Sequence, residues 1–521
     1  MMINRHTSPS CFLAKLLDGV ADVPAACDVA VAELRWDHRD VCAGDVFFAR
    51  RGATTDATKF AADVAARGAS AMVLEGTEVS RIDENGLLRV AVADVTQAAG
   101  IAAHRFFAKP SHSIPVIAVT GTNGKTSVAH YVAQALQTYR GSPVGVLGTL
   151  GSSIGGRLAP SAIESGLTTP DCIAVHRALA QFVAHGAVGA VMEASSHALD
   201  QQRLAGVRVD TAVFTNLSRD HLDYHGDMTR YANAKAELFR LPDLRAAVIN
   251  AMDPSADLMR TAIADNVSVI DYCLDEAAPT AGVLIHAHTK QATVKGLHLE
   301  LRTPTARVAI HSPLIGRPSA WNLLTAFAVL LCHGVGEVDA AELLGGVSPV
   351  TGRMQTLGGD DQALVVVDFA HTPAALEATL RALRALCTGR LWCVFGAGGE
   401  RDQGKRAMMG EISASQADVV IITDDNPRSE DGNSIVAQIQ SGVTMSQLAR
   451  VAVQRDRARA IADAVAGAQA GDIVLVAGKG HEPYQDVAGQ RLPFSDVAIA
   501  RAALSVKAAA CAAAQATGRA R

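Results

Sequence analysis

One short stretch constrains this chain more than any other: an apolar run, beginning at Ile114, that ends in the glycine-rich turn Gly121-Thr-Asn-Gly-Lys-Thr126. The β-branched residues before the turn indicate a strand, and the glycines let the backbone N–H groups point at a phosphate. Lys125 would contact the β and γ phosphates of ATP, and the Thr126 hydroxyl would bind Mg²⁺. The strict phosphate-loop pattern expects a glycine where this chain has Val119, so the loop is a variant. The sequence therefore predicts a strand, a phosphate loop and a helix that begins near Lys125.

The length and composition indicate a folded enzyme of several domains. A chain of 521 residues is too long for one hydrophobic core. Hydrophobic residues make up 49% and charged residues 19%, which excludes a disordered or fibrous chain. The net charge of -5, with no long basic run, argues against nucleic-acid binding. The nine cysteines form no C-x-x-C pair, so neither a zinc site nor a disulfide framework is indicated.

Nothing in the sequence indicates export or membrane insertion. The N-terminus lacks an uninterrupted apolar core before a small-residue cleavage site, so we expect no secretion signal. The most apolar stretch, Ala320 to Val335, contains Asn322, Thr325 and His333 and is too short to cross a bilayer. We expect a cytoplasmic protein.

Alternating apolar runs and amphipathic segments predict an α/β protein with three parts: residues 1–112, 113–347 and 348–521. The second and third parts read as doubly wound, mostly parallel sheets, in which ligands bind at the carboxyl ends of the strands. We predict strands at Val144–Leu147, Gly189–Glu193, Thr211–Thr215, Ala247–Asn250, Ala363–Asp368, Leu391–Phe395, Val419–Thr423 and Asp472–Ala477, and a terminal helix at Ser495–Ala514. Lys109–Ser113, with its Pro and Ser, is predicted to be an extended linker.

Three polar groups follow the strands of the second part. Glu193 ends an apolar strand, which would place its carboxylate beside the metal of the phosphate loop, although a helix cap or a surface carboxylate has the same pattern. His221 and His225 have zinc-ligand spacing, but the H-E-x-x-H order and a third ligand are missing, so one histidine helping Mg²⁺ is favoured. By pattern alone, Lys235 on an amphipathic helix is a solvated charge.

Three loops in the third part each follow an apolar strand and are rich in glycine, arginine and carboxylates: Gly396–Asp402, Asp425–Arg428 and Gly478–Glu482. Arginine suits a carboxylate, and a carboxylate suits an ammonium group. Together the loops predict a pocket for a zwitterion such as an amino acid. Each loop alone would also fit an ordinary polar connection at a strand end.

Taken together and in order, these motifs resemble the Mur ligase family over nearly the whole chain. The resemblance is carried by Gly44–Phe47, the phosphate loop, Thr168–Asp171, Glu193–Leu199, Asp220–Gly226, Lys235, Gly352–Met354, Asp368–Pro373 and the three C-terminal loops. Within the family, the chain is most similar to the ligases that add meso-2,6-diaminopimelate to UDP-N-acetylmuramoyl-L-alanyl-D-glutamate. A lysine-adding ligase, a folylpolyglutamate synthase and a phosphate-loop switch protein remain as alternatives.

The resemblance implies a uridine-nucleotide domain (1–112), a central ATPase domain (113–347) and a Rossmann-like amino-acid domain (348–521). It also implies a monomer that uses ATP and Mg²⁺ to form an amide through an acyl phosphate, in cytoplasmic peptidoglycan precursor synthesis. The implied catalytic residues are Lys125, Lys235, His221 and Glu193. The implied metal ligands are Thr126, Glu193, His221 and Lys235, the last as a CO₂-derived carbamate.

The resemblance also implies three sets of binding residues. ATP would contact Gly121, Thr122, Asn123, Gly124, Lys125, Thr126, Ser127 and Asn322. The UDP-linked dipeptide would contact His38, Thr168, Thr169, Ser195, Gln201 and Arg203. Diaminopimelate would contact Arg401, Asp425, Asn426, Pro427, Arg428, Gly478 and Glu482.

This chain departs from the family pattern at three places. His38 stands where the family usually has a serine, which removes a hydroxyl near the uridine nucleotide. Ser319 replaces the first asparagine of a motif near the adenine, and Gln355 replaces a glutamate. None of these changes removes a group that the chemistry requires.

Overall fold

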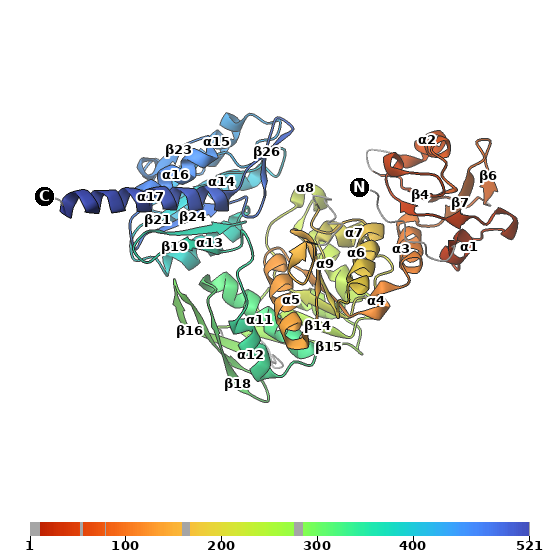
Figure 1. Ribbon diagram of the computed structural model, residues 1–521, viewed down its shortest axis with the longest axis horizontal. Coiled ribbons are helices and arrows are strands. Elements are labelled where there is room, and N and C mark those ends of the chain that lie inside the picture. The colour runs from red at the N-terminus through yellow and green to blue at the C-terminus, as the bar shows by residue number, and fades with distance from the viewer. Residues whose placement is uncertain (1–10, 53–55, 79, 159–166, 276–284, 520–521) are drawn as a thin grey trace.

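The computed structural model describes residues 11–52, 56–78, 80–158, 167–275 and 285–519. Within these residues the chain builds three large sheets, of five, eleven and six strands, in that order along the sequence. Figure 1 shows the five-stranded sheet at one end of the molecule, the six-stranded sheet toward the other, and the eleven-stranded sheet between them. The predicted α/β class is confirmed.

The five-stranded sheet has the order β3-β4-β5-β7-β6. Strands β3 (Leu34–Arg35), β4 (Val46–Ala49), β5 (Ala71–Glu75) and β7 (Leu88–Val92) are parallel, and β6 (Arg81–Ile82) is an antiparallel edge. Helix α3 (Val95–Phe106) packs on this sheet and contacts α6 (Cys172–Ala184) of the next part of the chain.

The prediction of an extended linker at Lys109–Ser113 was wrong. Pro110–Ser113 forms a single helical turn, α4. Pro110 occupies the first helical position, where its fixed φ is favourable and its missing N–H costs nothing. Lys109 before it adopts a left-handed conformation (φ 56°), which reverses the chain after α3. The backbone N–H of Arg208 donates to Ser111 Oγ at 3.0 Å, so the turn is anchored to the central part.

The eleven-stranded sheet brings three parallel strands together beside the phosphate loop. Strand β8 (Val116–Thr120) lies between β12 (Ala190–Glu193) and β13 (Thr211–Phe214), followed outward by β14 (Ala246–Asn250) and β15 (Ser268–Leu274). Helices α5 (Lys125–Arg140) and α11 (Gly316–Cys332) bury their apolar faces on one side of the sheet, and α6 covers the other. The carboxyl ends of β8, β12 and β13 therefore meet at one edge.

Antiparallel strands extend this sheet at both ends. On the β9 side (Gly145–Gly148) lie β10 (Gly151–Ile154) and β11 (Arg157–Leu158). On the other side β16 (Ile285–Thr293) pairs parallel with β15, and β16, β17 (Gly296–Arg302) and β18 (Arg307–Ser312) form an antiparallel meander. The sheet remains parallel around the phosphate loop.

The six-stranded sheet has the order β19-β20-β24-β21-β22-β23 and is parallel except for its first strand. Helices α13 (Pro373–Arg384), α14 (Gly404–Gln416) and α15 (Gly432–Gln440) cover one face, and α16 (Arg457–Gly467) and α17 (Asp496–Arg519) cover the other. Its six strands are β19 (Gln355–Gly358), β20 (Leu364–Asp368), β21 (Leu391–Phe395), β22 (Val419–Ile422), β23 (Val451–Val453) and β24 (Ile473–Ala477). This is the doubly wound arrangement that the alternating pattern predicts.

All eight predicted strands are present, with ends within one residue of the prediction. The terminal helix begins one residue later than predicted and runs on to Arg519. None of the helices in the described parts of the chain is long and apolar enough to cross a membrane.

Candidate active site

The phosphate loop is held by the residues that follow β13. The backbone N–H groups of Thr122 and Asn123 donate to the main-chain and side-chain oxygens of Asn216, at 2.8 and 3.0 Å. Thr215 Oγ1 donates to the carbonyl of Asn123 at 2.6 Å. A Cβ at Gly121 would lie 1.9 Å from that same Oγ1, so only glycine fits there. Val119 lies inside β8, before the turn, which shows that this variant loop does not need a glycine at that position.

Two lysines meet at this loop. Lys125 Nζ donates to the carbonyls of Gly121 and Thr122, at 2.8 and 2.9 Å. Lys235 Nζ reaches the same Gly121 oxygen at 2.9 Å from helix α9 (Met228–Ala236). Lys235 is 1% exposed, so its interpretation as a solvated charge was wrong. The amphipathic pattern misleads because the long stem carries the amine from the helix into the site.

Burial lowers the pKa of Lys235 well below its ordinary value of 10.5, and the nearby Lys125 lowers it further. Asp220 opposes both effects but does not overcome them. Burial also lowers the pKa of Lys125, although the nearby carboxylates of Glu193 and Asp220 raise it in part. An amine at Lys235 is therefore easily deprotonated.

Glu193 lies beside the first turn of α5. Its Oε2 accepts from Thr126 Oγ1 and from Thr149 Oγ1, both at 3.0 Å, and its Oε1 accepts from the N–H of Thr149 at 2.8 Å. The side chain is 2% exposed, so the surface-carboxylate alternative was wrong. Thr149, which follows β9, was not among the predicted residues.

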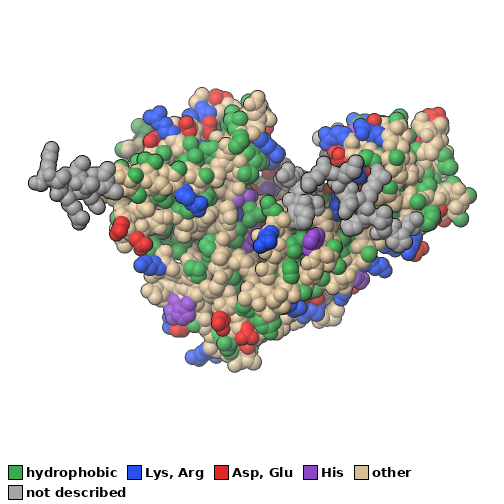
Figure 2. All heavy atoms as spheres, in the orientation of Figure 1, with side chains coloured by type: hydrophobic (Ala, Val, Ile, Leu, Met, Phe, Trp, Pro, Cys, Tyr) green, Lys and Arg blue, Asp and Glu red, His purple; other side chains and the backbone are tan. Residues whose placement is uncertain are grey.

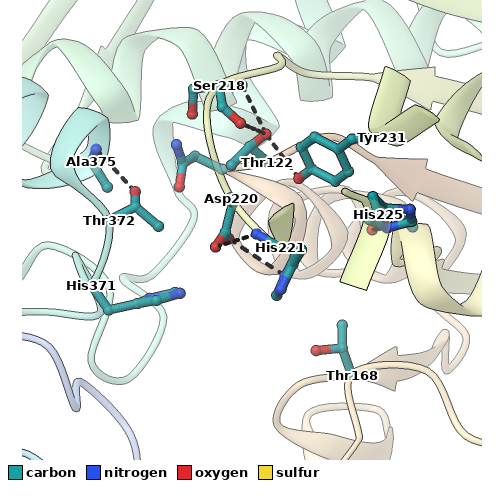
Figure 3. Close-up of polar contacts among 12 residues, drawn as sticks. Thr122, Thr168, Ser218, Asp220, His221, His225, Tyr231, His371, Thr372 and Ala375 are labelled. Carbon is teal, nitrogen blue, oxygen red and sulfur yellow. Dashed lines mark hydrogen bonds and ion pairs between the residues drawn. The ribbon is translucent and has the colours of Figure 1, made fainter. Parts of the chain in front are cut away.

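Asp220 and His221 occupy the centre of the region drawn in Figure 3. The Asp220 carboxylate accepts from the N–H of His221 at 3.0 Å, and the His221 ring nitrogen lies 3.4 Å from Oδ2. Burial raises the pKa of Asp220, but His371, His221, Lys405 and the hydrogen bond from the His221 N–H together lower it below its ordinary value of 3.8. Burial lowers the pKa of His221 to about 4.

The zinc alternative for His221 and His225 finds no support. His225 lies 3.0 Å from Ser196 Oγ and is buried against Tyr231 rather than sharing a ligand position. Among the residues that the structure describes, no group of three or more His, Cys, Asp or Glu side chains could hold a metal.

Five of the six residues predicted for the UDP-linked dipeptide, all except His38, form one hydrogen-bonded group next to Glu193. Thr169 Oγ1 donates to the Glu193 carbonyl at 2.7 Å and accepts from the N–H of Ser195 at 3.1 Å. Arg203 Nη1 donates to the Thr169 carbonyl at 2.6 Å, and its Nη2 donates to Gln201 Oε1 at 2.8 Å. Thr168 joins the group through Thr149, whose Oγ1 lies 3.4 Å from Thr168 Oγ1 and also donates to Glu193.

His38 lies apart from this group, in the short 3-10 turn His38–Asp40 that follows β3 of the N-terminal sheet. Its ring stacks on Phe60 with centroids 3.7 Å apart and an interplanar angle of 4°. The flanking Asp37 is bound by Arg39, and that hydrogen bond lowers the pKa of Asp37 to about 2. The histidine therefore replaces a hydroxyl with a flat aromatic surface.

The three C-terminal loops do converge. Asn426 Nδ2 donates to Glu482 Oε2 at 2.7 Å, and Arg428 Nη1 donates to the carbonyl of Gly399 at 2.6 Å. A Cβ at Gly478 would lie 2.4 Å from Asp425 Oδ2. The remaining predicted residues, Pro427 and the exposed Arg401, lie on the same two loops as these groups.

Asn322 lies on α11 against the phosphate loop. A Cβ at Gly124 would be 2.5 Å from its Oδ1, so the side chain is in contact with the loop that precedes α5. Ser127, in the first turn of α5, is 6% exposed and lies on the buried side of that helix. All of the predicted nucleotide-site residues therefore lie at the edge formed by β8 and α5.

Sequence reasoning missed the role of Arg353. Its Nη2 donates to Thr126 Oγ1 at 3.0 Å, and its guanidinium lies 4.4 Å from the centroid of the Phe369 ring. It thus joins the segment before β19 to the phosphate loop. Its Nε is buried without a hydrogen-bond partner among the described residues. Only the turn motif Gly352-Arg353-Met354 signals it in the sequence.

Lys405, in the first turn of α14, was missed as well. Burial lowers its pKa, while Asp220 of the central part and Asp425 of the C-terminal part raise it. Arg219 and Asp402 approach to 3.8 Å in the same region. Figure 2 shows a hollow between the N-terminal and C-terminal parts, with histidine side chains near it. Contacts of this kind depend on how the two parts fold against each other.

Residues 119–330 match the Mur ligase middle domain, and residues 352–480 match the glutamate ligase domain of Mur ligases. A relative from Xanthomonas oryzae pv. oryzae, named UDP-N-acetylmuramoyl-L-alanyl-D-glutamate--2,6-diaminopimelate ligase, is 44% identical over 95% of this chain and 98% of its own. The chain belongs to the Mur ligase family.

Solved structures of Mur ligases share its fold. One of a UDP-N-acetylmuramoyl-L-alanyl-D-glutamate--2,6-diaminopimelate ligase has a TM-score of 0.69 at 34% identity, covering 96% of this chain and 99% of that one. The MurF ligase of Thermotoga maritima in complex with ADP has a TM-score of 0.58 at 18% identity, covering 91% and 96%. The second likeness concerns the fold alone.

The donor set beside the phosphate loop of this Mur ligase fits Mg²⁺. Thr126 and Glu193 offer hard oxygen atoms 3.0 Å apart. Mg²⁺ prefers such ligands and completes its shell with water and substrate phosphates, so it does not need a cluster of protein carboxylates. The small number of protein donors here suits that ion rather than zinc.

Proposed function

We propose that this Mur ligase adds meso-2,6-diaminopimelate to the D-glutamate γ-carboxylate of UDP-N-acetylmuramoyl-L-alanyl-D-glutamate, with ATP converted to ADP and phosphate. The observation that carries the proposal is that one short segment contacts both the phosphate loop and the loop that carries Glu482. Arg353 donates to Thr126 beside the phosphate loop, and a Cβ on the neighbouring Gly352 would lie 2.2 Å from the backbone of Gly480 and His481. The name of the relative that is 44% identical supports the same reaction.

The phosphate loop and its neighbours perform the first step. The γ-carboxylate of the substrate attacks the γ-phosphorus of ATP and gives an acyl phosphate and ADP. Lys125 offsets the charge that would keep the two anions apart, and Thr126 and Glu193 would hold Mg²⁺. When bound, the ion neutralises phosphate charge. His221, beside Asp220, is assigned a supporting place at the same ion.

Lys235 is assigned a carbamate. An amine adds to CO₂ only in its neutral form, and the burial of Lys235 beside Lys125 favours that form. The modification turns a buried cation into an anion, which Lys125 and a metal would then stabilise.

The dipeptide end of the substrate is assigned to the group around Thr169. Arg203 is half-buried and supplies a cation for the substrate carboxylate, while Ser195 and Thr168 supply hydroxyls. The uridine nucleotide is assigned to residues 1–112, where the stacked ring of His38 offers an aromatic surface. ATP and the amino acid are assigned to residues 113–347 and 348–521.

The second step belongs to the C-terminal loops. Diaminopimelate, held by Arg428 and Glu482 at its distal end, presents its other amine to the acyl phosphate. The amine attacks the carbonyl carbon, the amide bond forms, and phosphate leaves. Positioning of the two substrates across the joint between the parts supplies much of the rate. We assign this reaction to cytoplasmic peptidoglycan precursor synthesis by a monomer.

The test is phosphate release in a coupled assay, with ATP, Mg²⁺ and the UDP-linked dipeptide supplied together with each candidate amino acid. The proposal predicts release that requires the dipeptide and is fastest with meso-diaminopimelate. Fastest release with L-lysine would indicate a lysine-adding ligase. Release with a folate and glutamate would indicate a folylpolyglutamate synthase, and release without any sugar nucleotide would indicate a phosphate-loop switch.

A further inference from the structure

The loop Gly478–Glu482 buries a lysine that the proposed reaction does not use. Lys479 is 0% exposed and donates from Nζ to Glu482 Oε2 at 2.7 Å and to Asn426 Oδ1 at 2.8 Å. Asn426 Nδ2 donates to the same Glu482 oxygen at 2.7 Å, which closes a triangle of three side chains. The ring of Tyr484 covers Nζ at 5.8 Å. Lys479 thus binds two residues of the amino-acid pocket to each other.

The triangle leaves one side of the Glu482 carboxylate available. Oε1 accepts no hydrogen bond from the residues that the structure describes, and the side chain keeps 24% exposure. Oε2, by contrast, is shared by Lys479 and Asn426. The carboxylate is therefore fixed in orientation, and it is already partly neutralised before any substrate ammonium reaches it.

The loop after β22 is held just as firmly. The N–H of Asp486 donates to Asn426 Oδ1 at 2.9 Å, and the N–H of Arg428 donates to the Asp486 carbonyl at 3.0 Å. Arg428 adopts a left-handed conformation (φ 53°), and its Nη1 donates to the carbonyl of Gly399 at 2.6 Å, which fixes the guanidinium against the loop Gly396–Asp402. The distal end of the pocket is thus a rigid array of charges.

Within the two loops Asp425–Arg428 and Gly478–Glu482 the formal charges balance: Lys479 and Arg428 contribute two positive charges, and Asp425 and Glu482 contribute two negative ones. Lys405 interacts with Asp425 as well as with Asp220, Asp402 and Arg401, so a further two positive and two negative charges lie beside these loops and leave the balance unchanged. Arg457, which lies behind Asp425, is paired with Asp496 at 2.7 Å and adds no net charge. A balanced array suits a distal carbon that carries both an ammonium and a carboxylate, as in meso-diaminopimelate. It suits the lone ammonium of lysine less well, because Lys479 has already neutralised the carboxylate that would bind it.

We propose that Lys479 is a specificity-determining positioning residue, which sets the net charge of the distal amino-acid site and thereby favours a zwitterionic end over a simple ammonium. This inference rests on the proposed function, since it concerns how the same pocket selects its amino acid. Lys479 acts through Glu482 and Asn426 and need not touch the substrate.

The experiment compares charge variants of the full chain. Lys479→Met removes the charge and keeps the stem, so the site gains a net negative charge. We expect the ratio of kcat/KM for meso-diaminopimelate to that for L-lysine to fall at least about tenfold, with the KM for ATP unchanged. Lys479→Arg keeps the charge and should retain most of the ratio.

Glu482→Gln removes a negative charge, so the site gains a net positive charge. Both amino acids lose the partner of their distal ammonium group, but the ratio of kcat/KM for meso-diaminopimelate to that for L-lysine should not fall. The double variant Lys479→Met, Glu482→Gln restores the balance and should recover the ratio toward that of the wild type. The melting temperature of Lys479→Met shows whether this variant folds. If it does not, the change in the preference for meso-diaminopimelate over L-lysine is measured in Glu482→Gln and in the double variant, and its direction tests the inference. A role in structure alone predicts equal losses for both amino acids.

An unchanged ratio in Lys479→Met, or a fall in Glu482→Gln, would overturn the inference. These results differ from a failure of the proposed function, in which the wild-type protein itself would not join meso-diaminopimelate to the UDP-linked dipeptide.

Discussion

Lys125 and Lys235 donate to one acceptor, the carbonyl oxygen of Gly121, at 2.8 and 2.9 Å. Two buried ammonium groups so close together repel each other, and burial lowers the pKa of both. Lys235 has the weaker compensation, since only Asp220 raises its pKa, whereas Glu193 also supports Lys125. This difference supports the proposed division of roles, in which Lys125 would serve as the cation and Lys235 would react as the neutral amine.

Lys235→Ala should abolish ligation and leave the fold intact. The variant loses the group to which we assign a carbamate, and added acetate or another short carboxylate should restore part of the activity. The measurement is turnover with and without carboxylate, together with the melting temperature. Lys295→Ala, at a side chain that is 80% exposed, is the matched control and should behave as the wild type. Near-normal turnover of Lys235→Ala would contradict the assignment.

Arg353→Lys should lower kcat by about one hundredfold. A lysine keeps the charge but loses the planar fork that contacts Thr126 and stacks on Phe369. Because this contact joins the C-terminal part to the phosphate loop, the loss should be greater in kcat than in the KM for either amino acid or ATP. Arg381→Lys, on the exposed face of α13, is the control. Equal kinetics for the two variants would show that the Arg353 contact is dispensable.

Arg428→Ala should lose most of the preference for meso-diaminopimelate over L-lysine. The two amino acids differ by a distal carboxylate, which the guanidinium can bind with parallel N–H bonds. Leaving such a group unpaired costs on the order of 3 kcal/mol, or roughly a hundredfold in discrimination. The rates with each amino acid at equal concentration measure the effect, with Arg459→Ala on α16 as an exposed control. Equal rates for both amino acids in the wild-type protein would refute the role of Arg428.

The free energy of unfolding should fall as the pH drops from about 6.5 to about 4. Burial lowers the pKa of His176, which is 0% exposed, to about 4. Below about pH 6.5 His176 becomes protonated in the unfolded chain but stays neutral in the folded chain. The free energy of unfolding therefore falls between about pH 6.5 and about pH 4 and changes no further through this group at lower pH. His176 alone accounts for up to about 3 kcal/mol.

His176 Nε2 lies 3.0 Å from the carbonyl oxygen of Ala205, which partly opposes the lowering of its pKa. The ring of His104 on α3 also faces it, with His112 of α4, Lys109 and Arg105 beyond. Denaturation at a series of pH values measures the slope. His176→Gln should flatten it, whereas His185→Gln, at the exposed end of the same helix, should not. A slope that His176→Gln leaves unchanged would contradict this source of acid sensitivity.

Much of the fold follows from local sequence pattern. Each predicted strand is a short apolar run bounded by turns, and burial on both faces of a parallel sheet requires such a run. The phosphate loop is equally local, since Gly121 and Lys125 lie within one turn. The linker at Lys109–Ser113 failed because one proline fits either an extended segment or the first turn of a helix, and the sequence does not distinguish them.

The site was predicted less completely, because parts of it depend on contacts between distant segments. Lys235 reads as a surface lysine until α9 is placed beside Gly121. Arg353 and Thr126 are 227 positions apart, and no local pattern joins them. The triangle around Lys479 is similar: Gly478–Glu482 marks the loop, but its contact with Asn426 requires β22 and β24 to lie on either side of β21.

The most direct test of the reaction follows the fate of an oxygen atom. The UDP-linked dipeptide is prepared with ¹⁸O in the D-glutamate γ-carboxylate and incubated with ATP, Mg²⁺ and meso-diaminopimelate, with Lys125→Ala as an inactive control. Mass spectrometry then follows both the nucleotide product and the released phosphate. Our account predicts a UDP-linked tripeptide and the transfer of a labelled oxygen to phosphate in each turnover. Phosphate without label, or ATP hydrolysis without tripeptide, would contradict it.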